Sequence, residues 1–142
     1  MERLDYKSIM IGDWVYNAHN RKNEMVQEIR EKFVMLDYND LYECDEIEPI
    51  PLTSEILVRN GFVLNRESPL LKEYICALGD SPDNNLFVSI YGKSLSDNRD
   101  FVKVCYCPLG TSEMIDVNIQ HCAVHQLQHA LRLCGIDKTI KL

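Results

Sequence analysis

Residues 9–16 read Ile-Met-Ile-Gly-Asp-Trp-Val-Tyr, and this stretch decides how the N-terminal part of the chain folds. Its apolar residues flank a Gly-Asp pair, which is a turn signal. After the turn, Trp14 and Tyr16 fall on one side of an alternating pattern and Val15 falls on the other. Alternation with a period of two is typical of a β-strand. The stretch therefore predicts a turn that leads directly into a strand.

Further strands are expected before the first pair of prolines. Residues 25–29 alternate and predict a second strand, residues 32–38 a third, and residues 42–47 a weaker fourth. The unit Pro49-Ile-Pro51 ends the last one, because proline cannot donate to a sheet ladder. Short strands so close together predict a small, strongly curved sheet. Ile-Gly-Asp-Trp-Val followed by a short loop resembles the start of many SH3-like barrels, a likeness of fold that implies no function.

The clearest helix has both of its ends marked in the sequence. Thr53 is a good N-cap, and acidic Glu55 lies in the first turn. Gly61 suits the left-handed position just beyond the helix, and Phe62 is then expected to fold back on Leu57. The helix is about two turns long, so packing against the rest of the protein must hold it.

A second helix is expected over residues 123–134. Val124, Leu127, Leu131 and Cys134 recur at three- and four-residue spacing and form one apolar stripe, which Gly135 closes. Between the helices we expect strands at residues 73–78, 86–91, 101–107 and 114–119, although residues 70–78 also suit a helix.

The predicted fold class is α+β. An SH3-like small β-barrel over residues 1–51 would pack on an α+β module over residues 52–142, built from an antiparallel sheet and two short helices.

Composition narrows the class of function. The chain has 142 residues, 46% of them hydrophobic, and a formal net charge of −7, which disfavours nucleic-acid binding. Residues 33–58 contain no Lys or Arg, whereas seven acids occur there: Asp37, Asp40, Glu43, Asp45, Glu46, Glu48 and Glu55. The ordinary interpretation is a solvated strand edge and loop. The alternative is a docking face for a basic partner.

The N-terminus shows no signal-peptide pattern, and no stretch approaches the ~18 apolar residues that span a bilayer. We therefore expect a cytoplasmic protein that does not enter a membrane. Its six cysteines are then expected to be reduced and to serve mostly as small buried side chains.

One set of side chains has the composition of a metal site. It comprises Cys105, Cys107, His121, Cys122, His125 and His129. In a helix that began early, the three His would share one face, and thiolates would complete a tetrahedral zinc site. However, only one residue separates Cys105 from Cys107, whereas structural zinc sites usually have two to four. We predict no metal and no cofactor, and interpret the His as solvent-facing or hydrogen-bonded.

Catalytic motifs are not found. Cys122 and His125, oriented by Asp116, would form a nucleophile pair on paper, but a buried inert thiol is the better interpretation. The sequence has no Gly-rich phosphate loop and no Gly-x-Ser-x-Gly elbow. We therefore expect a protein that is not an enzyme.

Two groups of side chains suggest binding instead. Trp14, Tyr16, Tyr38 and Tyr42 would form a peptide or nucleobase platform if exposed, although aromatic residues more often fill a small core. A modest basic cluster, Arg21, Lys22, Arg30 and Lys32, leaves a nucleic-acid-associated role open as an alternative.

Three stretches resemble an uncharacterised family of small proteins of Bacteroides-type gut bacteria and of their phages and prophages. They are Ile11-Gly-Asp-Trp-Val-Tyr16, the segment from Glu48 to Phe62, and Val124-His-Gln-Leu-Gln-His-Ala-Leu-Arg-Leu-Cys-Gly135. The resemblance implies a mobile-element accessory protein and assigns no catalytic residue.

We expect this protein to act by binding an unidentified protein partner, as a monomer or homodimer. The interaction residues would be Trp14 and Tyr16, or His125, Gln126 and Gln128 on an exposed face of the last helix.

Overall fold

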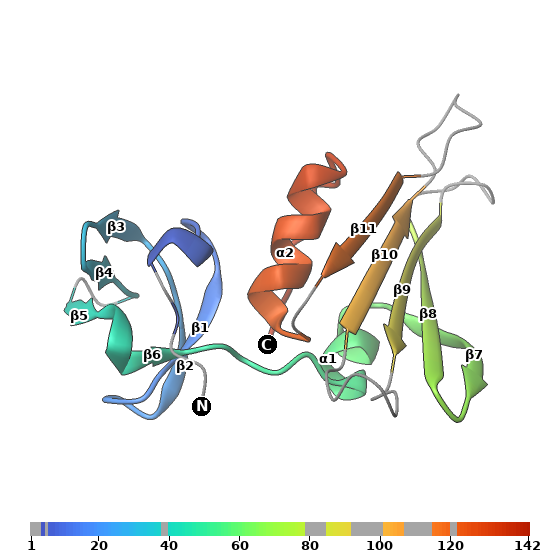
Figure 1. The fold of residues 1–142 in the computed structure, drawn as a ribbon, viewed down its shortest axis with the longest axis horizontal. Helices are drawn as coiled ribbons and strands as arrows, with labels where there is room; N and C mark the ends of the chain where they lie inside the picture. Colours follow the sequence, from blue (N-terminus) through green and yellow to red (C-terminus); the bar gives the residue numbers. More distant parts are fainter. Residues whose placement is uncertain are drawn as a thin grey trace. The chain divides into compact units, whose positions relative to one another are not determined.

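The computed structural model describes residues 4, 6–37, 40–78, 85–91, 101–106, 115–119 and 122–142 (Figure 1). Within them the fold is α+β, as the sequence predicts, because antiparallel sheets are combined with two α-helices. The chain divides into two compact units. Unit 1 consists of Met1–Pro51 and Ala123–His125, and unit 2 consists of Leu52–Cys122 and Gln126–Leu142.

The described part of unit 1 forms two three-stranded antiparallel sheets. The first has the order β2-β1-β6, with the bounds Lys22–Met25, Trp14–Asn17 and Ile47–Glu48. The second has the order β3-β4-β5, with the bounds Glu28–Arg30, Phe33–Met35 and Leu41–Glu43. Two single turns of 3-10 helix, η1 and η2, span Tyr6–Ser8 and Cys44–Glu46.

The chain passes from the first sheet to the second at Val26. The N–H of Val26 donates to the carbonyl of Asp13 (2.9 Å), whereas the N–H of Gln27 donates to the carbonyl of Met35 (2.8 Å). The strand predicted over residues 25–29 is therefore broken, because its two ends pair in different sheets. The predicted SH3-like barrel is not confirmed, since the two sheets are not closed.

The weak fourth strand predicted over residues 42–47 is also interrupted. Inside it, the N–H of Glu43 donates to the Glu46 carboxylate (2.9 Å). This local bond favours the turn of η2 over an extended backbone, so the sheet resumes only at β6.

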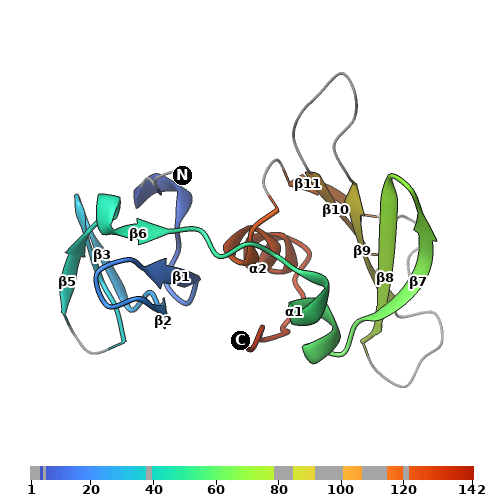
Figure 2. The ribbon, with the colours of Figure 1, turned by 90° about the horizontal axis from the view of Figure 1, so that it is seen from below.

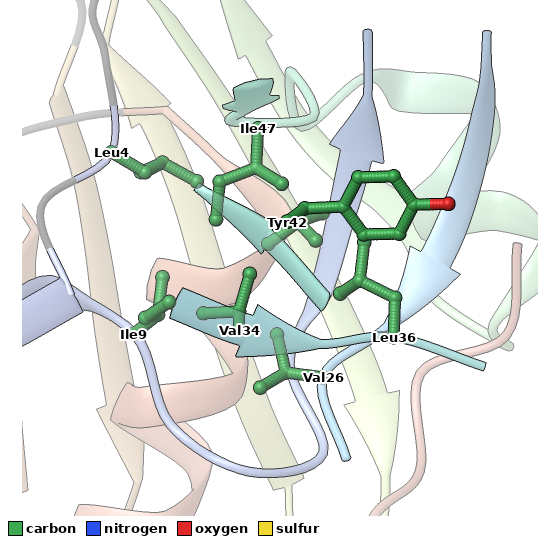
Figure 3. Packing of buried hydrophobic residues seen from close by; sticks show 8 residues of the cluster. Leu4, Ile9, Val26, Val34, Leu36, Tyr42 and Ile47 are labelled. Atoms are coloured by element: carbon green, nitrogen blue, oxygen red, sulfur yellow. The ribbon is translucent and has the colours of Figure 1, made fainter. Parts of the chain in front are cut away.

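The hydrophobic core of unit 1 draws on both sheets and on the N-terminal segment (Figure 3). Val15, Val34 and Leu36 are fully buried, and Tyr42 points into the same cluster. The whole cluster is Leu4, Ile9, Val15, Val26, Val34, Leu36, Tyr42 and Ile47. Val15 thus lies on the buried side of β1, opposite to Trp14 and Tyr16, as the alternation predicts.

A buried polar pair joins the two strands of the first hairpin. The side-chain amide of Asn17 donates to the Glu24 carboxylate (2.5 Å), and the Lys22 ammonium lies 3.3 Å from that carboxylate. Asn17 and Glu24 are 0% and 1% exposed. The Asn17 side-chain oxygen also accepts from the N–H of His19 (3.0 Å), which fixes the turn between β1 and β2.

Unit 2 contains a five-stranded antiparallel sheet with the order β11-β10-β9-β8-β7. The bounds are Ile115–Ile119, Phe101–Tyr106, Asn85–Tyr91, Leu71–Ala77 and Val63–Ser68. The first four confirm predicted strands, and residues 71–77 are strand rather than helix. Strand β7 is not predicted from the sequence, because all six of its residues are exposed and show no alternation.

Both helices lie on the same side of this sheet (Figure 2). They are α1, Ser54–Arg59, and α2, Val124–Leu133. On that side the side chains of Tyr74, Val88 and Val104 form one buried cross-strand row. The Tyr74 hydroxyl donates to the Ser54 hydroxyl (2.5 Å) and so connects the sheet to α1.

The ends of α1 match the sequence prediction. The Thr53 hydroxyl accepts from the N–H of Ile56 (3.3 Å) at the start of the helix. At its end Gly61 has a φ of 85°, and the N–H of Phe62 donates to the carbonyl of Leu57 (3.0 Å). These bonds are those of a Schellman motif, which needs a residue without a Cβ at the left-handed position.

Candidate interaction surface

The structure scatters the six candidate metal ligands over several elements. Cys105 lies on β10, Cys122 precedes α2, and His125 and His129 lie within α2. Cys107 and His121 lie outside the described residues. Within the part of the chain that the structure describes, no three His, Cys, Asp or Glu side chains gather to hold a metal ion.

Cys105 faces Asp116 across the pair of strands β10 and β11. Burial and a hydrogen bond to the Asp116 carboxylate raise the pKa of the Cys105 thiol to about 11. The Lys103 ammonium lies 3.5 Å from the same carboxylate. Because only the thiolate is an effective nucleophile, a thiol of such high pKa is unsuited to nucleophilic catalysis near neutral pH.

The nucleophile arrangement weighed from the sequence is not supported by these contacts. The Cys122 thiol donates to the carbonyl of Leu52 (3.3 Å), while Asp116 is engaged by Lys103 and Cys105. A carboxylate that orients a catalytic histidine must hydrogen-bond that histidine, and Asp116 is committed elsewhere.

The expected interaction face of α2 is not exposed. His125 is 2% exposed and Gln128 is 8% exposed, while Gln126 and His129 are half-buried. The expected exposed face is therefore not found at His125 and Gln128, and of the two interpretations of His125, solvent-facing or hydrogen-bonded, burial leaves the second. The apolar stripe itself is confirmed, because Val124, Leu127, Leu131 and Cys134 are buried. Burial extends beyond that stripe on the helix, which the spacing of apolar residues does not reveal.

Trp14 and Tyr16 lie on the outward side of the first sheet of unit 1. Trp14 is paired with Met25 across β1 and β2, and Tyr16 is paired with Glu48 of β6. Both aromatic side chains are half-buried and lie outside the core cluster, whereas Tyr42 belongs to that cluster. Tyr38 lies outside the described residues.

The second sheet of unit 1 exposes its outward apolar side chains more fully. Phe33 is 42% exposed and Leu41 is 47% exposed, and Leu41 is paired across the sheet with half-buried Met35. Phe33 is paired with exposed Glu43. We call the surface formed by Phe33, Met35, Leu41 and Glu43 the apolar face. The sequence marks its acidic residues but not its apolar ones, because only strand pairing places residues 35 and 41 side by side.

A recess of about 340 Å³ opens at one end of the apolar face. Its lining comprises Lys32, Phe33, Glu43, Cys44 and Asp45. The recess therefore combines an aromatic wall and a thiol with two carboxylates and one cation, Lys32. At the edge strand β3, Arg30 and Glu28 form an ion pair (2.6 Å), and Arg30 lowers the pKa of Glu28. The pair carries no net charge, so it does not offset the acids of the rim.

A second recess, of about 330 Å³, lies in unit 2 between the start of α1 and the turn that joins β7 to β8. It is lined in part by Ser54, Leu70, Lys72 and Tyr91. The Lys72 ammonium lies 3.7 Å from the Glu67 carboxylate. The lining combines one cation with hydroxyl groups, the Cys122 thiol and apolar groups, and it includes no carboxylate or imidazole.

Comparison of the chain with protein-family models, curated proteins and solved structures finds no match. None of the helices in the described residues has the length and apolar character needed to cross a bilayer.

Proposed function

We propose that this protein is a non-enzymatic accessory protein of a phage, prophage or related mobile element, which acts in the cytoplasm by binding another protein. The observation that supports binding most directly is the apolar face, where Phe33 and Leu41 are 42% and 47% exposed. The two side chains are diagonal neighbours connected by Met35, which is paired with Leu41, and a contiguous exposed apolar patch is a feature of interaction sites. The mobile-element role rests on the resemblance of the three sequence stretches.

The organisation of unit 1 supports an SH3-like arrangement as part of this proposal. Two small antiparallel sheets are joined by a chain that turns sharply at Val26 and enclose one apolar cluster. In such an arrangement the inward side chains form the core, and the outward side chains remain available to a partner. The outward aromatic residues Trp14 and Tyr16 belong to the other sheet and would form a second, separate binding surface.

The alternative role in nucleic-acid binding receives less support. Two of the four cations in the basic cluster are engaged by carboxylates: Lys22 by Glu24 (3.3 Å) and Arg30 by Glu28 (2.6 Å). A cation that is already paired with a carboxylate neutralises a phosphate less well, so it releases fewer of the counterions bound to the nucleic acid and contributes less to affinity.

A pull-down from cells that carry the source element tests the proposal. The full chain should recover a specific protein, and the double variant Phe33→Ser/Leu41→Ser should lose it. The matched control is Leu133→Ser, which removes a side chain that is 76% exposed on α2 and should keep the partner. Recovery of background alone, or equal recovery by the double variant, would contradict the proposed function.

A further inference from the structure

The outward side of β4 presents apolar groups at alternate positions. Phe33 and Met35 are two residues apart, so they are separated by about 6.6 Å along the strand. Leu41 is paired with Met35 and widens the apolar strip by one strand. An extended peptide repeats its side chains at the same interval. The apolar face therefore matches an extended segment with apolar residues at every second position.

The recess beside Phe33 offers a place for one side chain of such a segment. Its volume of about 340 Å³ is at the lower end of the range for ligand sites. Phe33 provides the apolar wall, and Glu43 and Asp45 provide acceptors at the rim. The two carboxylates outnumber the single Lys32 ammonium in this lining. A Lys or Arg side chain therefore suits it, because its methylene stem packs on apolar surface while its charge reaches the carboxylates.

The charge of the surrounding chain favours a basic segment. Within unit 1, residues 33–48 have six acids and no Lys or Arg, and Lys32 precedes them. Exposed Asp37 and Asp40 lie in the connection between β4 and β5. The Asp37 side chain accepts from the N–H of Met25 (2.9 Å), which holds this carboxylate in place. Fields of one sign at a surface attract partners of the opposite sign and repel phosphates.

We propose that the apolar face binds an extended basic segment of the protein partner, in which Lys or Arg alternates with apolar residues. The apolar side chains lie over Phe33, Met35 and Leu41. A Lys or Arg at the end of the segment turns into the recess toward Glu43 and Asp45, and the other cations, which leave the extended backbone on the opposite side, are attracted by the field of the acids that precede β5. This inference rests on the proposed function and names the chemistry of the partner.

Fluorescence anisotropy with labelled peptides and the full chain tests the proposal. The probes are a nonapeptide of alternating Lys and Leu, an analogue with Ser in place of Leu, and an analogue with Glu in place of Lys. We expect the Lys/Leu peptide to bind at low salt, the Lys/Ser analogue to bind at least about tenfold more weakly, and the Glu/Leu analogue not to bind. Tenfold corresponds to about 1.4 kcal/mol.

Two variants of the protein locate the contact. Phe33→Ser/Leu41→Ser should weaken binding of the Lys/Leu peptide at least about tenfold. Glu43→Gln/Asp45→Asn should weaken it severalfold and flatten its salt dependence. The control Leu133→Ser should bind normally. Circular dichroism and a thermal melt show whether each variant is folded, which is expected because all the substituted side chains of the apolar face are exposed.

The outcomes separate this inference from the proposed function. Equal affinity for the Lys/Leu and Lys/Ser peptides, or binding that neither variant weakens, overturns the inference. The inference is also overturned if the protein binds anionic vesicles or a DNA duplex and the Phe33→Ser/Leu41→Ser variant loses that binding. If the pull-down recovers a partner through Phe33 and Leu41, and the segment of that partner in contact is not basic, the proposed function holds and the inference fails. If no partner is recovered, the proposed function itself fails.

Discussion

At the residue scale, the buried carboxylate of Glu24 determines how well the first hairpin is held. Its carboxylate contacts the Asn17 amide and the Lys22 ammonium, and Glu24 is 1% exposed. Glu24→Ala leaves the Asn17 donor buried without this acceptor, which costs about 2–3 kcal/mol in the free energy of unfolding. Glu24→Gln keeps the shape and one acceptor and should cost less. Urea unfolding measures both, and equal losses would contradict this account.

The thiol of Cys105 gives a second prediction at this scale. Its pKa is raised to about 11, so the thiolate, which reacts with iodoacetamide, forms only as the pH approaches that value. Asp116→Asn removes a negative charge that raises the pKa, and should speed alkylation of Cys105 severalfold at pH 8. Tandem mass spectrometry distinguishes Cys105 from the other cysteines.

Buried Cys134 serves as the control for this measurement, because burial alone raises the pKa of its thiol. Its alkylation rate should be the same in the wild type and in Asp116→Asn. A Cys105 rate that is unchanged or lower in the variant would mean that Asp116 does not hold the thiol in its protonated form.

At the scale of single elements, α1 depends on its N-cap. The helix has six residues, so each capping bond is a large part of its stability. Thr53→Ala removes the acceptor for the N–H of Ile56 and should lower the free energy of unfolding by about 1 kcal/mol. Thr53→Ser retains the hydroxyl and should change it little. Thermal melts compare the two, and an unaffected Thr53→Ala variant would show that the cap contributes nothing.

Elements with local signals are the ones that the sequence predicts. The residues that cap α1 lie within a few positions of one another in the sequence, and so do the residues of the apolar stripe of α2. Both helices can therefore be predicted without knowledge of the fold. Strand β7 has no such signal, because it is exposed on both sides and, among the described strands, pairs with β8 alone. The break at Val26 is also invisible in the sequence, because it depends on Asp13 and Met35 as distant partners.

At the scale of the whole molecule, the candidate site was only partly predictable. The sequence shows the acidic stretch and the outward side of Trp14 and Tyr16. It does not show that Leu41 lies beside Met35, since this follows from the pairing of β4 with β5. It also places His125 and Gln128 on an exposed face, whereas the structure buries them. The resemblance to phage and prophage proteins stays a prediction.

The central claim is that this protein works by presenting the outward side of β3, β4 and β5 to a partner protein. Amide hydrogen exchange of the full chain, with and without the protein recovered in the pull-down, tests it most directly. We predict slower exchange over residues 28–45 in the complex and unchanged exchange in β7 and in the last turn of α2. Protection confined to the five-stranded sheet or to α2, with residues 28–45 unaffected, would contradict the claim.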